Sequence, residues 1–179
     1  RERVEWGLHR ACPDDLAVSV NLSPRQFNDE HLVSDVAAIL ERTGLPPRLL
    51  VLEITESVFL GDVESSKRAL VALRSMGVRV ALDDFGTGYS SLSHLRDLPI
   101  DAVKLDRSFV AEMCRHSRDA LIVQAVITLA HSMGMTTVAE GVETTEQLEE
   151  LRALGLKFAQ GFLFASPLEA VHAEELLVG

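Results

Sequence analysis

The sequence predicts an α/β fold with a parallel sheet, specifically a TIM-like barrel of the (β/α)8 type, and three observations support this prediction. Short segments rich in β-branched residues alternate with segments whose apolar residues recur at helical spacing. The strand-like segments are mostly apolar rather than alternating, which is typical of a parallel sheet buried on both faces. Each of them also delivers a carboxylate, amide or amine side chain near its carboxyl end.

Six segments are expected to form strands. In chain order they are Leu16–Leu22, Leu49–Thr55, Val78–Asp84, Asp101–Asp106, Thr136–Glu140 and Lys157–Phe162. The polar residues at or just after their ends are Asn21, Glu53, Glu56, Asp83, Asp84, Lys104, Asp106, Glu140, Glu143 and Gln160. In a barrel such ends converge on one mouth, whereas in an open doubly wound sheet they form a row. The regular placement at every strand therefore favours the barrel.

Four amphipathic stripes between the strands predict helices. Their apolar residues are Leu32, Val36, Ile39 and Leu40; Leu70, Leu73 and Met76; Leu121, Val126, Leu129 and Met133; and Leu148, Leu151 and Leu154. The expected carboxyl-terminal glycines are Gly44, Gly77, Gly134 and Gly155, and the expected N-caps are Asp62, Ser117 and Thr144. Further helices are expected over Arg1–Ala11 and Pro167–Val178.

The whole chain, residues 1–179, is expected to belong to one domain. A barrel of this type has eight strands, and about six are counted here. The two missing strands are expected to precede Arg1, because the chain begins inside a helical pattern. The chain is then expected to be the carboxyl-terminal three-quarters of its domain.

Composition excludes several classes of function. The net charge of −10 argues against a basic groove that tracks long nucleic acid. No apolar run is long enough to span a membrane, and no secretory signal opens the chain, so a cytoplasmic location is expected for this segment. Two cysteines are too few for a disulfide framework. The motifs of dinucleotide-binding, Walker A, zinc-protease and serine-hydrolase sites are absent from the sequence.

The polar strand ends favour a site for hard divalent cations. Asn21, Glu53, Asp83, Asp84 and Glu140 offer only oxygen ligands, which suit Mg²⁺ or Mn²⁺. Adjacent aspartates can bridge a metal pair that supports attack on a phosphodiester, and Lys104 could orient the attacking water or stabilise phosphate charge. Taken singly, each residue is more often an N-cap, a turn residue or a solvated lysine. Their coincidence at six consecutive strand ends favours the metal site.

Several motifs resemble the EAL domain family of cyclic di-GMP phosphodiesterases. They occur in the order and spacing of that family and cover nearly the whole chain. The motifs are Val20–Ser23, Leu52–Glu56, Asp83–Leu92, Val103–Val110, Val138–Glu143 and Gln160–Phe162.

The resemblance implies a modified TIM barrel that hydrolyses cyclic di-GMP to linear pGpG with two Mg²⁺ or Mn²⁺ ions, and for which Ca²⁺ is inhibitory. It assigns Asn21, Glu53 and Asp83 to one metal, with Asp83 as the bridge, and Asp84 and Glu140 to the second. It assigns Lys104 to water activation and Gln160 to a contact with the site water or ligand. Glu56 would anchor the Asp84–Ser90 loop, and Asp106 and Glu143 would support the site.

The sequence departs from the family at two points. Phe162 stands where tyrosine is commoner, and the Glu-Ala-Leu tripeptide is absent from the 179 residues. That tripeptide carries a metal ligand and is expected on a strand before Arg1. The alternative function is therefore a catalytically impaired module for cyclic di-GMP binding, dimerisation or regulation. The expected partners are cyclic di-GMP, a second copy of the chain, and an upstream sensor, receiver or GGDEF-type domain in a parent that a membrane could anchor.

Overall fold

The computed structural model describes residues 16–60, 62–86, 98–114, 117–168 and 172. The predicted helix at Arg1–Ala11 and most of that at Pro167–Val178 lie outside the described residues. Among the helices in the described ranges, none combines the length and the apolar character needed to cross a bilayer.

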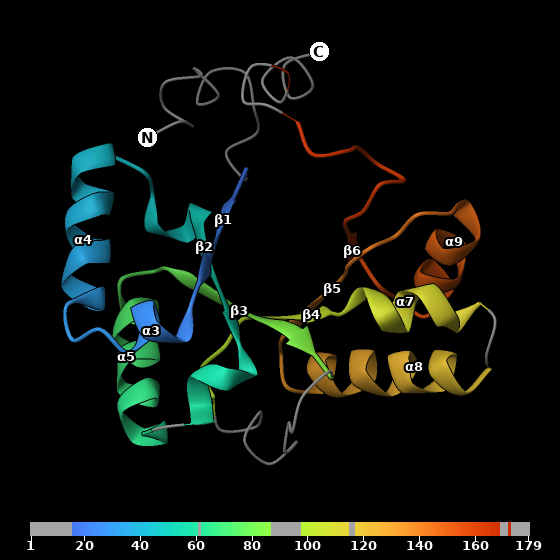
Figure 1. The fold of residues 1–179 in the computed structure, drawn as a ribbon, viewed down its shortest axis with the longest axis horizontal. Helices are drawn as coiled ribbons and strands as arrows, with labels where there is room; N and C mark the ends of the chain where they lie inside the picture. Colours follow the sequence, from blue (N-terminus) through green and yellow to red (C-terminus); the bar gives the residue numbers. More distant parts are fainter. Residues whose placement is uncertain (1–15, 61, 87–97, 115–116, 169–171, 173–179) are drawn as a thin grey trace.

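Six parallel strands form one sheet in which spatial order follows chain order (Figure 1). They are β1 (Val18–Leu22), β2 (Leu50–Thr55), β3 (Arg79–Phe85), β4 (Ala102–Leu105), β5 (Thr136–Ala139) and β6 (Phe158–Ala159). All six predicted strands are confirmed, although β6 is shorter than Lys157–Phe162. Within the described ranges β1 pairs only with β2 and β6 only with β5, so these two strands are the sheet edges.

The helices alternate with the strands. They are α3 (Pro24–Phe27), α4 (Leu32–Thr43), α5 (Val63–Ser75), α7 (Arg107–Met113), α8 (Ser117–Ser132) and α9 (Thr145–Ala153), with 3-10 turns η1 (Pro47–Leu49) and η2 (Glu56–Leu60). Asp62 accepts the N–H groups of Glu64 and Ser65 and thereby caps α5, and Thr144 caps α9 in a capping box, as predicted. Ser117 is instead the first residue of α8.

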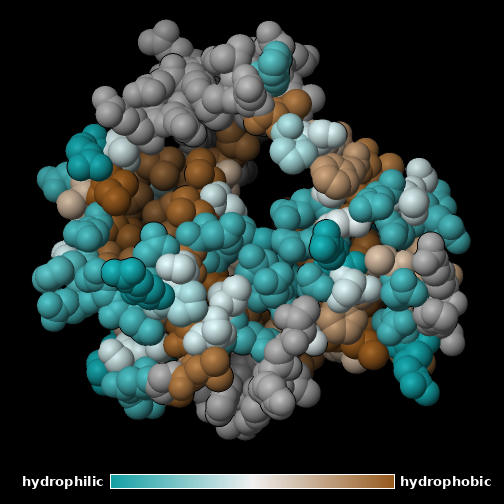
Figure 2. Space-filling view, viewed as in Figure 1, coloured by the Kyte–Doolittle hydropathy of each residue, from teal (hydrophilic) through white to brown (hydrophobic). Residues whose placement is uncertain are grey.

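The helices pack against the outer face of the curved sheet in two groups. Helices α4 and α5 cover β1 to β3, and helices α7, α8 and α9 cover β4 to β6 (Figure 1). Leu52, Val80 and Val103 point outward from their strands into this core and are nearly fully buried. The edge strand β1 is an exception, because Val18 and Val20 are 37% and 42% exposed. Figure 2 shows hydrophobic surface around this edge.

Strand register places the predicted site residues on the opposite, inner face. Asn21 lies beside Glu53, and Thr55, two residues after Glu53, lies beside Asp83. Successive side chains of a strand point to opposite faces, so residues two apart share a face. Lys104 lies beside Val138, and Glu140 follows Val138 by two residues. The inner face at the carboxyl ends of the strands is therefore polar, while the outer face is apolar.

Candidate metal centre at the carboxyl ends of the strands

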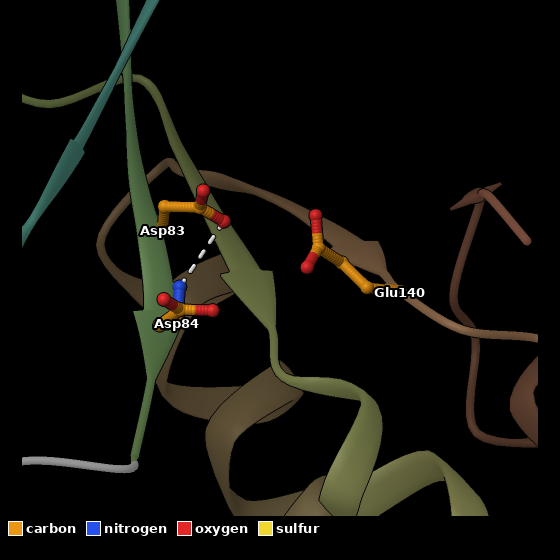
Figure 3. A group of neighbouring side chains, drawn as sticks. All are labelled: Asp83, Asp84 and Glu140. Atoms are coloured by element: carbon orange, nitrogen blue, oxygen red, sulfur yellow. Dashed lines mark hydrogen bonds between the residues drawn. The ribbon is translucent and has the colours of Figure 1, made fainter. Parts of the chain in front are cut away.

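A bulge in β3 brings two consecutive aspartates to one site. The register between β3 and β4 shifts between Leu82 and Phe85. Within that shift Asp84 has a φ of 52°, the only positive φ of a non-glycine residue in the described chain. Asp and Asn tolerate this left-handed conformation better than most residues. The Asp84 N–H donates to Asp83 Oδ1 at 3.1 Å. Both side chains then face the site instead of opposite sides of the sheet (Figure 3).

Asp83, Asp84 and Glu140 form a group whose ligand oxygens all lie within 4.8 Å of one another. Figure 3 shows the Glu140 side chain extending from the end of β5 toward the two aspartates on β3. Three carboxylates from two strands therefore approach a common point, although Glu140 is more than fifty residues from the two aspartates in the sequence.

Lys104 lies among the carboxylates and is 5% exposed. Its Nζ is 2.6 Å from Glu53 Oε2, 3.0 Å from Asp83 Oδ1 and 2.5 Å from Glu140 Oε1. Lys104 is the third residue of β4, and its three carboxylate partners come from β2, from β3 and from the residue that follows β5. Burial alone would lower the pKa of Lys104, but the hydrogen bonds to Glu140, Glu53 and Asp83 outweigh burial and raise it. Lys104 is therefore an ammonium ion at neutral pH.

One ammonium does not balance the negative charge of this site. Burial, together with Asp83 and Glu53, raises the pKa of Glu140 despite the opposing effect of Lys104. Burial, together with Asp83 and Asp106, likewise raises the pKa of Asp84. Raised carboxyl pKa values mean that the folded chain resists full ionisation of the cluster. An all-oxygen donor set with excess negative charge fits Mg²⁺ or Mn²⁺.

The other predicted site residues occupy different surroundings. Asn21 lies next to Glu53 on the edge strand β1 and is exposed. Asp106 accepts hydrogen bonds from the Ser108 N–H at 3.0 Å and the Ser108 hydroxyl, and caps α7. Burial would raise the pKa of Asp106, but the hydrogen bonds from Ser108 outweigh burial and lower it. The side chain of Glu143 is exposed, and its N–H donates to Gln147 Oε1 at 2.8 Å.

Glu56 reaches the end of β3. The Gly86 N–H donates to Glu56 Oε1 at 3.5 Å, while Glu56 Oε2 is buried and accepts no hydrogen bond from the residues that the structure describes. A buried carboxylate oxygen left unpaired is costly. The predicted anchoring of the Asp84–Ser90 loop concerns a segment of which residues 87–90 lie outside the described ranges.

Sequence reasoning missed two glycines that allow the strand ends to approach one another. A Cβ on Gly141 would lie 2.5 Å from Arg107 Cβ, and a Cβ on Gly161 would lie 2.2 Å from the Val142 carbonyl oxygen. Contacts this short exclude any side chain. The available signal was their position, because each glycine directly follows a predicted site residue, Glu140 or Gln160.

We compared the chain with known protein families. The EAL domain family model matches residues 4–167. The chain belongs to the EAL domain family. The Pseudomonas aeruginosa protein NbdA, a cyclic di-GMP phosphodiesterase, is 41% identical over 183 residues, which cover 97% of this chain and 23% of NbdA. This chain thus spans about a quarter of the length of that relative.

Solved EAL structures share the fold at high similarity. The PaMucR phosphodiesterase in complex with c-di-GMP is 41% identical, with a TM-score of 0.89, over 96% of this chain and 70% of that one. The manganese and cy-diGMP complex of Klebsiella pneumoniae BlrP1 is 32% identical, with a TM-score of 0.83, over 93% of this chain and 41% of that one. The expected TIM-like α/β fold is thereby confirmed.

Proposed function

We propose that this chain forms the catalytic part of a metal-dependent phosphodiesterase that hydrolyses cyclic di-GMP to linear pGpG. The observation that carries the proposal is the buried Lys104 ammonium held by Glu53, Asp83 and Glu140, beside Asp84, at the carboxyl ends of the strands. Active sites of TIM-like barrels lie at this end. Family membership supports cyclic di-GMP as the substrate, since relatives such as NbdA are named for this activity.

Asn21, Glu53, Asp83, Asp84 and Glu140 would hold the metal ions. Bound Mg²⁺ or Mn²⁺ would supply Lewis acidity and a more acidic water. We propose Lys104, Glu140 and Gln160 as the residues that serve the reaction beside the metal. Glu56 would anchor the loop after β3, and Asp106 and Glu143 would support the site. Ca²⁺ is proposed to inhibit, because it accepts longer and more flexible coordination than Mg²⁺.

The reaction assigns a clear task to the chain's own groups. A water oxygen bonds to one phosphorus of the cyclic dinucleotide, one P–O ester bond breaks, and the water's proton ends on the departing ribose oxygen. The Lys104 ammonium orients the water and stabilises the charge that grows on phosphate oxygens. Glu140 lies in contact with Lys104 and so holds the ammonium in place beside the proposed metal ligands.

Partners and location follow from the same proposal. Cyclic di-GMP is the proposed ligand, a second copy of the chain is the proposed dimer partner, and a cytoplasmic site is proposed because the nucleotide is an intracellular second messenger. The relative MucR is described as a bifunctional diguanylate cyclase and phosphodiesterase, which supports a GGDEF-type domain in the parent protein.

The deciding experiment measures pGpG formation by chromatography with the full-length protein that contains this sequence. Metal-stripped protein with Mg²⁺ restored should hydrolyse cyclic di-GMP, and Lys104→Ala or Glu53→Ala should lower kcat/KM by about a hundredfold to a thousandfold. Lys157→Ala and Glu41→Ala, which change exposed residues outside the site, should keep the wild-type rate. Undiminished turnover in both site variants would contradict the assignment.

A non-hydrolytic binding module is the second candidate, because the Glu-Ala-Leu tripeptide is absent from these 179 residues. Calorimetry with cyclic di-GMP separates the two functions. Binding in Ca²⁺ together with no turnover in Mg²⁺ or Mn²⁺ would identify a receptor instead of an enzyme.

A further inference from the structure

One oxygen of the Glu140 carboxylate accepts two protein donors. Lys104 Nζ lies 2.5 Å from Glu140 Oε1, and Gln160 Nε2 donates to the same atom at 2.7 Å. Two donors on one oxygen fix both the position and the rotation of the carboxylate plane, because the lysine arrives from β4 and the amide from the end of β6.

The backbone around Gln160 is tied to the segment that carries Glu140. The Gln160 N–H donates to Ala139 O at 2.8 Å, and the Val142 N–H donates to Gln160 O at 3.1 Å. The chain continues along the same segment, because the Leu163 N–H donates to Val142 O at 3.0 Å. These bonds continue the short β5·β6 ladder past its last paired residues. The amide of Gln160 is therefore held in register with Glu140.

Gly161 allows this close approach. A Cβ at this position would lie 2.2 Å from Val142 O, 2.3 Å from Val142 N and 2.8 Å from Val142 C. All three are backbone atoms, which cannot move aside as a flexible side chain can. Any other residue at position 161 would therefore push the Gln160 segment away from the end of β5.

We infer that Gln160, held against β5 by Gly161, is a positioning residue that orients the Glu140 carboxylate for metal binding. The inference rests on the metal site of the proposed function. The side chain of Gln160 is exposed and belongs to neither apolar core. Replacing Gln160 therefore removes one hydrogen bond without opening a cavity.

The test compares Mn²⁺ affinity, measured by calorimetry without nucleotide, with the steady-state constants for cyclic di-GMP, using the full-length protein. Gln160→Ala should weaken Mn²⁺ binding about tenfold and lower kcat, while KM stays within about twofold of wild type, because loss of an orienting partner typically costs ten- to hundredfold in metal affinity. Gln124→Ala, which removes an exposed amide on α8, should change none of these constants.

Gly161→Ala is the second variant to be tested in the same Mn²⁺-binding experiment. It should reproduce the loss of Mn²⁺ affinity of Gln160→Ala, and the double variant should lose no more than the larger single loss, because both changes remove the same hydrogen bond. Gly155→Ala is the matched control, since Gly155 has a φ of 83° but no atom within 4 Å of an added Cβ.

Two outcomes overturn the inference: an unchanged Mn²⁺ affinity in Gln160→Ala, or a raised KM as its main effect. If the wild type binds Mn²⁺ and Gln160→Ala weakens it, yet no pGpG forms, the proposed hydrolysis fails while the positioning role stands. If pGpG forms but Mn²⁺ affinity does not depend on Gln160, the positioning role fails alone. A wild type that binds no Mn²⁺ overturns both.

Discussion

The two ends of the same strands carry two different ion-pair arrangements. At the amino end, Arg74 Nη2 lies 2.8 Å from Asp101 Oδ1, and Asp101 Oδ2 accepts the Val80 N–H at 2.9 Å. Asp101 thus forms an ion pair with Arg74 and also accepts a hydrogen bond from a backbone N–H group of β3. At the carboxyl end, Lys104 alone faces Glu53, Asp83 and Glu140, with Asp84 close by.

The difference separates an end of the sheet where the charges are paired from an end that carries excess negative charge. At the amino end the charges are balanced, because one oxygen of Asp101 lies against Arg74 and the other accepts a backbone hydrogen bond. The carboxyl-end cluster leaves negative charge uncompensated, and the folded chain tolerates it by raising carboxyl pKa values. TIM-like barrels commonly divide their two ends in this way.

The largest expected effect is on metal affinity at the carboxyl end. Asp83→Ala should weaken Mn²⁺ binding by at least about a hundredfold, because it removes a ligand oxygen and a partner of Lys104 together. Calorimetry at constant pH measures the change. Arg74→Ala, at the other end, should leave the Mn²⁺ dissociation constant unchanged, and an equal loss in both variants would show that the two ends are not independent.

A moderate effect on the free energy of unfolding is expected from a substitution at the amino ends of the strands. Asp101→Ala should lower the free energy of unfolding by about 1–3 kcal/mol, because the Val80 N–H loses its acceptor and Arg74 loses its partner. Denaturant titration of the metal-free protein measures this loss, and Mn²⁺ affinity of the folded variant should match wild type. A stability equal to wild type would remove Asp101 from its proposed structural role.

The smallest effect concerns the pH dependence of stability without metal. Glu140 has a folded-state pKa above its ordinary value of 4.5, so between those two values the unfolded chain binds fewer protons than the folded chain. The contribution of Glu140 to stability therefore falls as pH rises from about 4.5 through the folded-state pKa. Glu140→Gln lacks this fall, so its stability relative to wild type should be higher at pH 7 than at pH 4.

Saturating Mn²⁺ is the control for this pH comparison. The wild type should then become the more stable protein at pH 7, because metal binding stabilises the folded state and Glu140→Gln has lost a ligand. Parallel pH profiles of the two metal-free proteins would contradict the raised pKa of Glu140 in the folded chain.

Local sequence patterns predicted the six strands and the helices α4, α5, α8 and α9. The β-branched runs predict all six strands, and alternation along each strand predicts the face on which side chains such as Glu53, Asp83 and Lys104 lie. The caps at Asp62 and Thr144 are equally local, since a cap bonds N–H groups only two or three residues away. The short helix α7 was not predicted, because seven residues give too short a period.

Contacts between distant strands decided what those residues do. Lys104 could be read from the sequence as a solvated lysine or an edge residue, but the structure buries it against Glu53, which is 51 residues away. The turn of Asp84 toward Asp83 needed the bulge in β3, and the hydrogen bond from Gln160 to Glu140 needed Gly161 against Val142. Periodicity determines which face a side chain occupies, whereas the partners it meets there depend on strand register and backbone approach, which exist only once the sheet has assembled.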